Sequence, residues 1–153
     1  MNKDKILITC REPIIICGFA GIGKSFLSNQ TSYKVIDLES TDFNKNWDIY
    51  IKVARRLVLN GYTVLLSCHK ELRQKLLEQS IQFITVMPSA TYKFDDTVFD
   101  SKSVYLKRYK NRGNTQEFID KMLNNWGEYN TKLENEEVVE LPLNLFLQDI
   151  LIF

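Results

Sequence analysis

An eight-residue segment near the N-terminus constrains the fold of this chain more than any other feature. It follows the pattern G-x-x-x-x-G-K-[ST] without a mismatch, and an apolar run, residues 14–17, comes directly before it. In such a segment the glycines let consecutive backbone N–H groups point inward around a phosphate, and the helix that follows directs its N-terminus at the same anion. This order of strand, turn and helix predicts a phosphate-binding P-loop. The P-loop consists of Gly18, Phe19, Ala20, Gly21, Ile22, Gly23, Lys24 and Ser25.

The last two residues of the P-loop carry the side chains for nucleotide chemistry. The ammonium group of Lys24 is placed to reach the β and γ phosphates of a bound nucleotide, and the hydroxyl of Ser25 is placed to bind Mg²⁺. We therefore expect ATP and Mg²⁺ as cofactors, with the whole P-loop contacting the nucleotide. A glycine-rich turn that arises by chance is the competing interpretation, and the complete motif directly after an apolar strand argues against it.

The composition and charge of the chain narrow its class. Its 153 residues are enough for one domain with a core, and 20 Lys and Arg against 19 Asp and Glu give no reason to expect a nucleic-acid or membrane partner. Cys10, Cys17 and Cys68 lack C-x-x-C spacing, and His69 is the only histidine, so neither a disulfide framework nor a metal site of these residues is predicted. No apolar run is long enough to span a bilayer, and we expect a cytoplasmic monomer or homodimer.

Apolar patterning along the chain alternates between strand and helix signals, which predicts an α/β fold. We expect a three-layer α/β/α sandwich around a five-stranded parallel sheet, with ligands at the carboxyl ends of its strands. Strands are predicted at residues 13–18, 33–39, 62–68, 83–87 and 137–141, with either a short edge strand or a packed arm at 5–10. Helices are predicted at 24–30, 47–60, 70–79 and 104–111, then from an N-cap at Asn114 with Glu117 as capping-box partner and an apolar stripe to Trp126, and finally around 145–151. Residues 88–103 show no clear pattern.

Two acidic residues stand at the end of the second predicted strand. Asp37 and Glu39 are two apart, so on a strand they share a face beside the P-loop. Two carboxylates there can hold Mg²⁺ through water or accept a proton from an acceptor hydroxyl; alternatively, they only end the strand and cap a loop. The third strand ends at Ser67 without the acid that many P-loop NTPases place there, so the metal would depend on Ser25, the nucleotide and Asp37 or Glu39.

Several arginines are candidates for contacts with phosphate. Arg108 and Arg112 are four apart in a predicted helix, and two guanidiniums on one face suit a transferring phosphoryl group, although a solvated helix face is the alternative. Arg73, in the first turn of the helix after the third strand, could bind the phosphate of a second substrate or face solvent. Late in the second predicted helix, Arg55 or the arginine that follows it could line an acceptor pocket.

On these residues the chain resembles small P-loop kinases of the nucleoside monophosphate kinase type, broadly adenylate-kinase-like. It is also similar to the compact shikimate and gluconate kinases and to kinase-like proteins encoded by bacteriophages. The resemblance covers most of the chain and rests on the P-loop, the order of five strands, and the Arg108-x-x-x-Arg112 element, which in such families belongs to a short lid. It implies that Arg108 packs against the donor nucleotide, that Arg112 contacts the transferring phosphates, and that Asp37 and Glu39 serve Mg²⁺ and an acceptor hydroxyl.

The chain departs from typical adenylate kinases in two places. The third strand ends in the sequence Ser-Cys-His-Lys, residues 67–70, where those enzymes have Gly-Phe-Pro-Arg. The short lid also lacks a four-cysteine zinc site. Both differences affect what the resemblance implies about the phosphoryl acceptor more than what it implies about the donor nucleotide.

The sequence thus leads to one expectation and two alternatives. We expect a single domain over residues 1–153, with a lid near residues 104–116, that transfers the γ-phosphoryl group of ATP to a nucleoside or deoxynucleoside monophosphate. A kinase of a small hydroxylated metabolite is favoured instead if Asp37 is a base. The third possibility is a nucleotide-binding or NTPase module that acts through a protein partner, and its expected third-strand acid is absent. The residues expected in catalysis are Lys24, Asp37, Arg108 and Arg112, those expected to bind the acceptor are Glu39, Arg55 and Arg73, and the expected metal ligands are Ser25 and Asp37.

Overall fold

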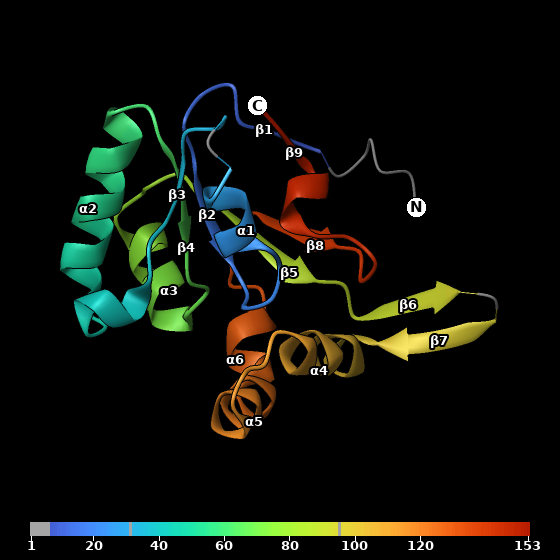
Figure 1. The fold of residues 1–153 in the computed structure, drawn as a ribbon. Helices are drawn as coiled ribbons and strands as arrows, with labels where there is room; N and C mark the ends of the chain where they lie inside the picture. Colours follow the sequence, from blue (N-terminus) through green and yellow to red (C-terminus); the bar gives the residue numbers. More distant parts are fainter. Residues whose placement is uncertain (1–6, 31, 95) are drawn as a thin grey trace.

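Five parallel strands form the central sheet of the molecule, in the order β3-β4-β2-β5-β8 (Figure 1). A computed structural model of the chain describes residues 7–30, 32–94 and 96–153. The predicted five-stranded parallel sheet is confirmed, although most of its strands are shorter than the apolar runs suggested. The strands are β2 (Ile15–Gly18), β3 (Val35–Asp37), β4 (Thr63–Leu66), β5 (Ile84–Pro88) and β8 (Val138–Leu141).

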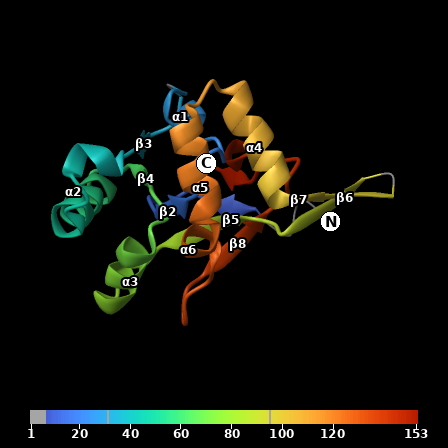
Figure 2. The same ribbon diagram turned by 90° about the horizontal axis from the view of Figure 1, so that it is seen from below.

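Helices cover both faces of this sheet, an arrangement compatible with a three-layer sandwich (Figures 1 and 2). Two helices pack on one face, and the others contribute to the core on the opposite side. Within the described ranges, no helix combines the length and the apolar character that crossing a bilayer requires. The helices are α1 (Lys24–Ser28), α2 (Trp47–Leu59), α3 (Lys70–Glu78), α4 (Ser101–Asn111), α5 (Gln116–Asn124) and α6 (Trp126–Asn130), with a 3-10 helix η2 (Ser40–Phe43) before α2.

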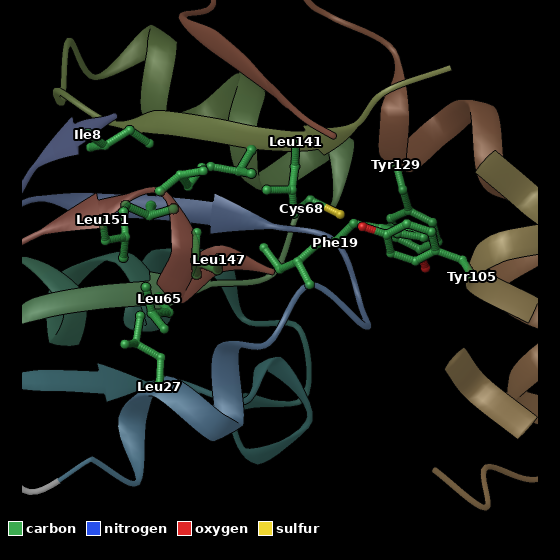
Figure 3. Close-up of a cluster of buried hydrophobic side chains, with 14 of the residues drawn as sticks. Ile8, Phe19, Leu27, Leu65, Cys68, Tyr105, Tyr129, Leu141, Leu147 and Leu151 are labelled. Atoms are coloured by element: carbon green, nitrogen blue, oxygen red, sulfur yellow. The ribbon is translucent and has the colours of Figure 1, made fainter. Parts of the chain in front are cut away.

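Side chains along the central strands alternate between two cores. Ile15 and Cys17 of β2 pack against α2 and α3, whereas Ile16 between them belongs to the core on the other side, together with Leu65 of β4. Successive residues of a strand point to opposite faces, so a sheet covered on both sides needs continuous apolar runs of this kind. Figure 3 shows the second core, which also takes in Phe19 of the P-loop.

The two ends of the described chain meet in a separate two-stranded parallel sheet. β1 (Ile8–Thr9) pairs with β9 (Leu151–Ile152), and the backbone N–H of Ile8 donates to the carbonyl of Ile150 at 2.7 Å. The strand expected within residues 5–10 is thus present at 8–9, while residues 5 and 6 lie outside the described ranges. The prediction of a closing helix around 145–151 is wrong, because this segment contains a short 3-10 helix, η3 (Leu147–Asp149), followed by β9. Pairing with a strand more than 140 residues earlier overrides the helical spacing of the leucines.

The segment without a sequence pattern forms a hairpin. β6 (Thr91–Phe94) and β7 (Thr97–Asp100) pair antiparallel, with Thr91 opposite Asp100, and project away from the sheet (Figures 1 and 2). α4 follows immediately, three residues earlier than predicted, because the carboxylate of Asp100 accepts a hydrogen bond from the backbone N–H of Ser103 at 2.9 Å and caps the helix.

The region after α4 corrects two further expectations. The N-cap of α5 is Thr115, not Asn114: its hydroxyl oxygen accepts a hydrogen bond from the backbone N–H of Phe118 at 3.2 Å. The apolar stripe that runs to Trp126 does not belong to one helix, because the chain leaves the helical conformation at Asn125 and divides the stripe between α5 and α6. The break places Trp126 and α6 against the P-loop.

Candidate functional site

The P-loop connects β2 to α1 at the carboxyl edge of the sheet, as the motif predicts. Gly21 and Gly23 have φ angles of 93° and 104°, a left-handed conformation that residues with a Cβ rarely adopt. A Cβ on Gly23 would also lie 3.0 Å from the Oε1 atom of Gln148, in the segment after β8. Gly23, the second glycine of the motif, is therefore favoured both by the turn itself and by its close packing on the C-terminal part of the chain.

The two polar side chains that end the P-loop are held by local hydrogen bonds. The Nζ atom of Lys24 donates to the carbonyls of Gly18 and Phe19, at 2.7 and 3.2 Å, so the ammonium lies across the loop. The hydroxyl of Ser25 donates to Oδ2 of Asp37 at 3.1 Å, while Oδ1 of Asp37 is buried without a partner in the described part of the chain. The fold thus brings together Ser25 and Asp37, the two expected metal ligands.

A cavity of about 670 Å³ opens beside the P-loop. Its walls come from the ends of β2, β3 and β4, from the helices after β7, and from the segment after β8. Both Asp37 and Glu39 line it, although β3 ends at Asp37 and Glu39 already belongs to the following turn. The polar and charged lining residues outside the P-loop are Asp37, Glu39, Ser40, Thr41, Ser67, His69, Arg112, Lys121 and Gln148.

Aromatic side chains of α4 and α6 anchor the P-loop. Phe19 is fully buried, and its ring lies 4.9 Å from that of Trp126 and 5.7 Å from that of Tyr129, both in α6. From α4, the ring of Tyr105 lies 5.8 Å away, and the hydroxyl of Tyr109 donates to the carbonyl of Ala20 at 2.8 Å. These contacts connect the region expected to form a lid directly to the backbone that is to hold phosphate.

The structure places the two arginines of the expected lid differently. Arg112, at the end of α4, lines the cavity as expected. Arg108 does not line it: its guanidinium donates to the carbonyls of Gly21, Leu143 and Leu145 at 2.9–3.0 Å and lies 4.0 Å from the ring centre of Phe146. Arg108 therefore connects the P-loop to the segment after β8, and the expectation that it contacts the donor nucleotide is replaced by this positioning role.

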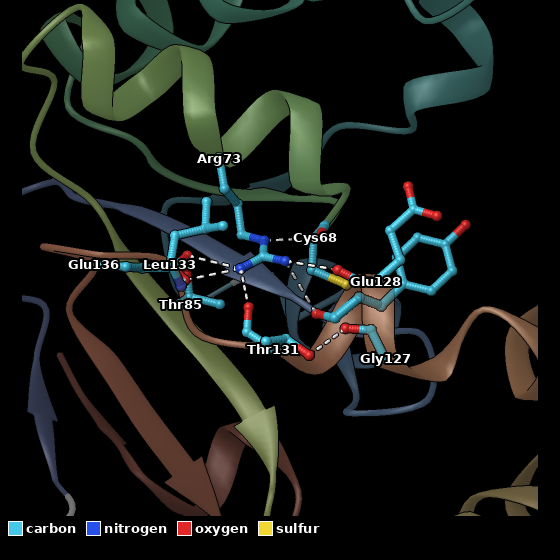
Figure 4. Close-up of polar contacts among 9 residues, drawn as sticks. Cys68, Arg73, Thr85, Gly127, Glu128, Thr131, Leu133 and Glu136 are labelled. Atoms are coloured by element: carbon cyan, nitrogen blue, oxygen red, sulfur yellow. Dashed lines mark hydrogen bonds and ion pairs between the residues drawn. The ribbon is translucent and has the colours of Figure 1, made fainter.

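Arg73 is not an acceptor-binding residue in this structure. Its side chain is completely buried, and it forms an ion pair of 2.8 Å with Glu136, just before β8 (Figure 4). Its remaining N–H groups donate to the carbonyls of Cys68, Glu128 and Thr131 at 2.9–3.1 Å. A guanidinium whose donors are all engaged in the core has none left for a substrate phosphate, so this prediction is wrong.

Arg55 is likewise removed from the candidate site. It is exposed on α2, and it lines two small surface depressions together with Gln79, the residue after α3, instead of the P-loop cavity. Lys121, exposed in the last turn of α5, is a cation that does line the cavity and that the sequence did not single out. Neither Arg112 nor Lys121 forms an ion pair with a carboxylate of the described residues.

His69, for which no role was predicted, lines the cavity at the end of β4. Its Nδ1 atom lies 2.9 Å from the hydroxyl of Ser67, and its ring packs against Trp47 and Tyr129 at 5.0 and 5.1 Å between ring centres. Burial, helped by the positive charges of Lys45 and Lys121, lowers the pKa of His69 from 6.5 to about 4. The imidazole is therefore neutral at pH 7. In the sequence, the feature that could have indicated His69 as a cavity residue is its position shortly after a central parallel strand.

This pKa shift leads to a prediction about stability. Between pH 4 and 6.5 an unfolded chain protonates His69 and the folded one does not, so the unfolded state binds more protons and stability falls as the pH is lowered through this window. We expect the His69→Gln variant to lose less unfolding free energy than the wild type between pH 6.5 and pH 4.5, measured by urea denaturation at each pH. Parallel curves for the two proteins would contradict the shift.

Burial also argues against cysteine chemistry at this site. Cys68 lines the cavity, and burial raises the pKa of its thiol to about 11, so the thiol stays protonated near pH 7. A reactive thiolate is therefore not available at this site near pH 7.

Comparisons with known proteins add no family to this description. No protein-family model matches the chain, and no curated protein matches it at a significant level.

Proposed function

We propose that the protein is an ATP-dependent phosphotransferase that moves the γ-phosphoryl group of ATP to a nucleoside or deoxynucleoside monophosphate. The observation that supports this most is the meeting of a complete P-loop with Asp37 at the mouth of a 670 Å³ cavity. A site for ATP alone would not need a second polar region, whereas this cavity extends past the P-loop to the ends of β3 and β4. We call that region, lined by residues 37–41 and 67–69, the acceptor side.

On the donor side, the residues present fit a magnesium nucleotide. Mg²⁺ prefers hard oxygen ligands, and the hydroxyl of Ser25 with the unpartnered Oδ1 of Asp37 provides them, directly or through water. Bound Mg²⁺ would neutralise charge on the β and γ phosphates. Lys24, now bonded to loop carbonyls, supplies a cation that phosphate oxygens can attract, and Arg112 faces the same space from α4.

Arg55 and Arg73, the arginines expected to bind the acceptor, are absent from the cavity lining, whereas two other cations outside the P-loop line it. Arg112 and Lys121 both line the cavity and form no ion pair with a carboxylate of the described residues, although Nε of Arg112 donates to Oδ1 of Asn114 at 3.0 Å. Their positive charges can therefore hold the phosphate of the acceptor. A phosphate acceptor is already ionised and needs no strong base. Asp37 and Glu39 can then serve the metal.

One observation favours the alternative of a small hydroxylated acceptor. Two carboxylates, Asp37 and Glu39, line the acceptor side, and Asp37 is within reach of the P-loop hydroxyl. A carboxylate so placed can accept the proton of an acceptor hydroxyl as it attacks the γ-phosphorus. Loss of most turnover in an Asp37→Asn variant that still binds Mg²⁺ and ATP would favour this alternative.

The proposal is tested by measuring ADP formation from ATP and Mg²⁺ with a panel of acceptors. The panel contains the common ribonucleoside and deoxyribonucleoside monophosphates, nucleosides, shikimate, gluconate and a reaction without acceptor. We expect ADP formation that depends on one or a few monophosphates. Turnover with a hydroxylated metabolite alone would support the alternative, and equal turnover without any acceptor would replace both by an NTPase.

A further inference from the structure

The acceptor side of the cavity contains a polar pair that the proposed function has not used. Ser67 and His69 both line the cavity at the end of β4, and the Nε2 atom of His69 is buried without a hydrogen-bond partner in the described part of the chain. Leaving a buried polar atom unpaired is unfavourable, so such an atom in a cavity wall indicates a group that pairs with a ligand.

The orientation of this pair is fixed by its surroundings. The ring of His69 is held between Trp47 and Tyr129, at angles of 45° and 83° to their planes, and Trp47 is itself bound through its indole N–H to Glu71 at 3.1 Å. The hydroxyl of Tyr50 accepts a hydrogen bond from the backbone N–H of Ser67 and donates to the carbonyl of Leu38, which joins the ends of β3 and β4. A rigid polar pair of this kind is suited to recognising a ligand through hydrogen bonds of fixed direction.

The pair offers one donor and one acceptor whichever tautomer His69 adopts. If Ser67 donates to Nδ1, then Nε2 carries a hydrogen and the serine oxygen keeps a lone pair; if Nδ1 donates, then Nε2 accepts and the serine hydroxyl is free to donate. The low pKa of His69 keeps the ring neutral and preserves this pairing near pH 7. Leu38, Cys68 and Met122 add apolar surface to the lining of the same cavity.

We propose that Ser67 and His69 recognise the nucleobase of the acceptor through a base edge that presents a donor beside an acceptor. A planar base can pair its edge with these residues while its faces lie against apolar walls. A polyol would leave hydroxyl groups unpaired against the same walls. The inference rests on the proposed function for the presence of an acceptor, and it names the residues that would select one.

The test compares ligands that differ only by the base. Calorimetric titrations use AMP, GMP, CMP and UMP, with ribose 5-phosphate as the probe without a base, on the wild type and on the His69→Leu and His69→Gln variants. In the wild type the preferred monophosphate should bind at least about tenfold more tightly than ribose 5-phosphate, as one or two hydrogen bonds to a buried pair provide. His69→Leu should reduce this ratio to about twofold or less, whereas His69→Gln, whose amide can still donate and accept, should retain most of it.

Two controls separate base recognition from other effects. If His69 recognises the base, the affinity for ribose 5-phosphate should be similar in all three proteins. A purely structural role of His69 would instead weaken the binding of every ligand, ribose 5-phosphate included. Equal affinity of the wild type for monophosphates and ribose 5-phosphate, or an unchanged ratio in His69→Leu, would overturn the inference. If the ratio behaves as expected but no acceptor supports ADP formation, the phosphotransferase proposal fails and base recognition stands.

Discussion

Replacing Arg73 with methionine is expected to lower the free energy of unfolding by about 3–5 kcal/mol, because it leaves Glu136 as an unpaired charge in the core. The two side chains are 0% exposed, and Glu136 is also fixed by hydrogen bonds from Thr85 at 2.7 Å and from the backbone of Leu133 at 3.0 Å. The guanidinium further ties α3 to the end of α6 through carbonyl contacts, which methionine cannot replace. Urea denaturation followed by circular dichroism measures the loss.

The chain offers a matched control on the same helix. Lys75 of α3 pairs with Asp48 at 3.3 Å, but both side chains are exposed, at 39% and 74%, so Lys75→Met should change the free energy of unfolding by less than about 1 kcal/mol. The double variant Arg73→Met with Glu136→Leu should recover part of the loss, because it removes the unpaired charge. A loss in Arg73→Met no larger than that in Lys75→Met would show that the buried pair does not hold these elements together.

Replacing Lys24 with alanine is expected to reduce ADP formation by about 10²–10³-fold, the range associated with removing one group that stabilises transition-state charge. Among the described residues, the Lys24 ammonium bonds to the carbonyls of Gly18 and Phe19, at a partly buried position. The substitution should therefore change the free energy of unfolding by only about 1 kcal/mol. Steady-state turnover with the preferred acceptor, together with denaturation curves, separates loss of chemistry from loss of fold.

An exposed lysine outside the cavity supplies the comparison for Lys24. Lys52 lies on α2, away from the P-loop, and Lys52→Ala should leave turnover within about twofold of the wild type. If Lys24→Ala retained turnover at the level of Lys52→Ala, the P-loop would not be the phosphoryl-transfer site.

The features that could be read from the sequence depend on short-range patterns. The P-loop motif is defined by spacing within eight residues, and the structure places it between a strand and a helix as predicted. The helix 47–60 was predicted from apolar positions that recur once per turn before Asn60, and it is present as α2 (Trp47–Leu59). The five apolar runs predicted a sheet covered on both faces, because the side chains on both sides of such strands are buried against helices. Asp37 was predicted to lie beside the P-loop because parallel strands end at the same edge of a sheet, and its contact with Ser25 agrees.

The sequence alone determined the parallel sheet, the P-loop and the acid at its edge, because local spacing and apolar patterning specify them. The features that were missed depend on partners far away in the sequence. Only the tertiary structure decided that Arg73 pairs with Glu136, 63 positions later, and that Arg108 binds the carbonyls around the P-loop instead of the cavity. It also decided that β9 forms as a strand beside β1, and that His69 faces the cavity with a nitrogen unpaired among the described residues. In each case the fate of a side chain or segment depends on which distant donors, carboxylates or strand edges the fold brings within hydrogen-bonding distance, and no short-range pattern encodes that.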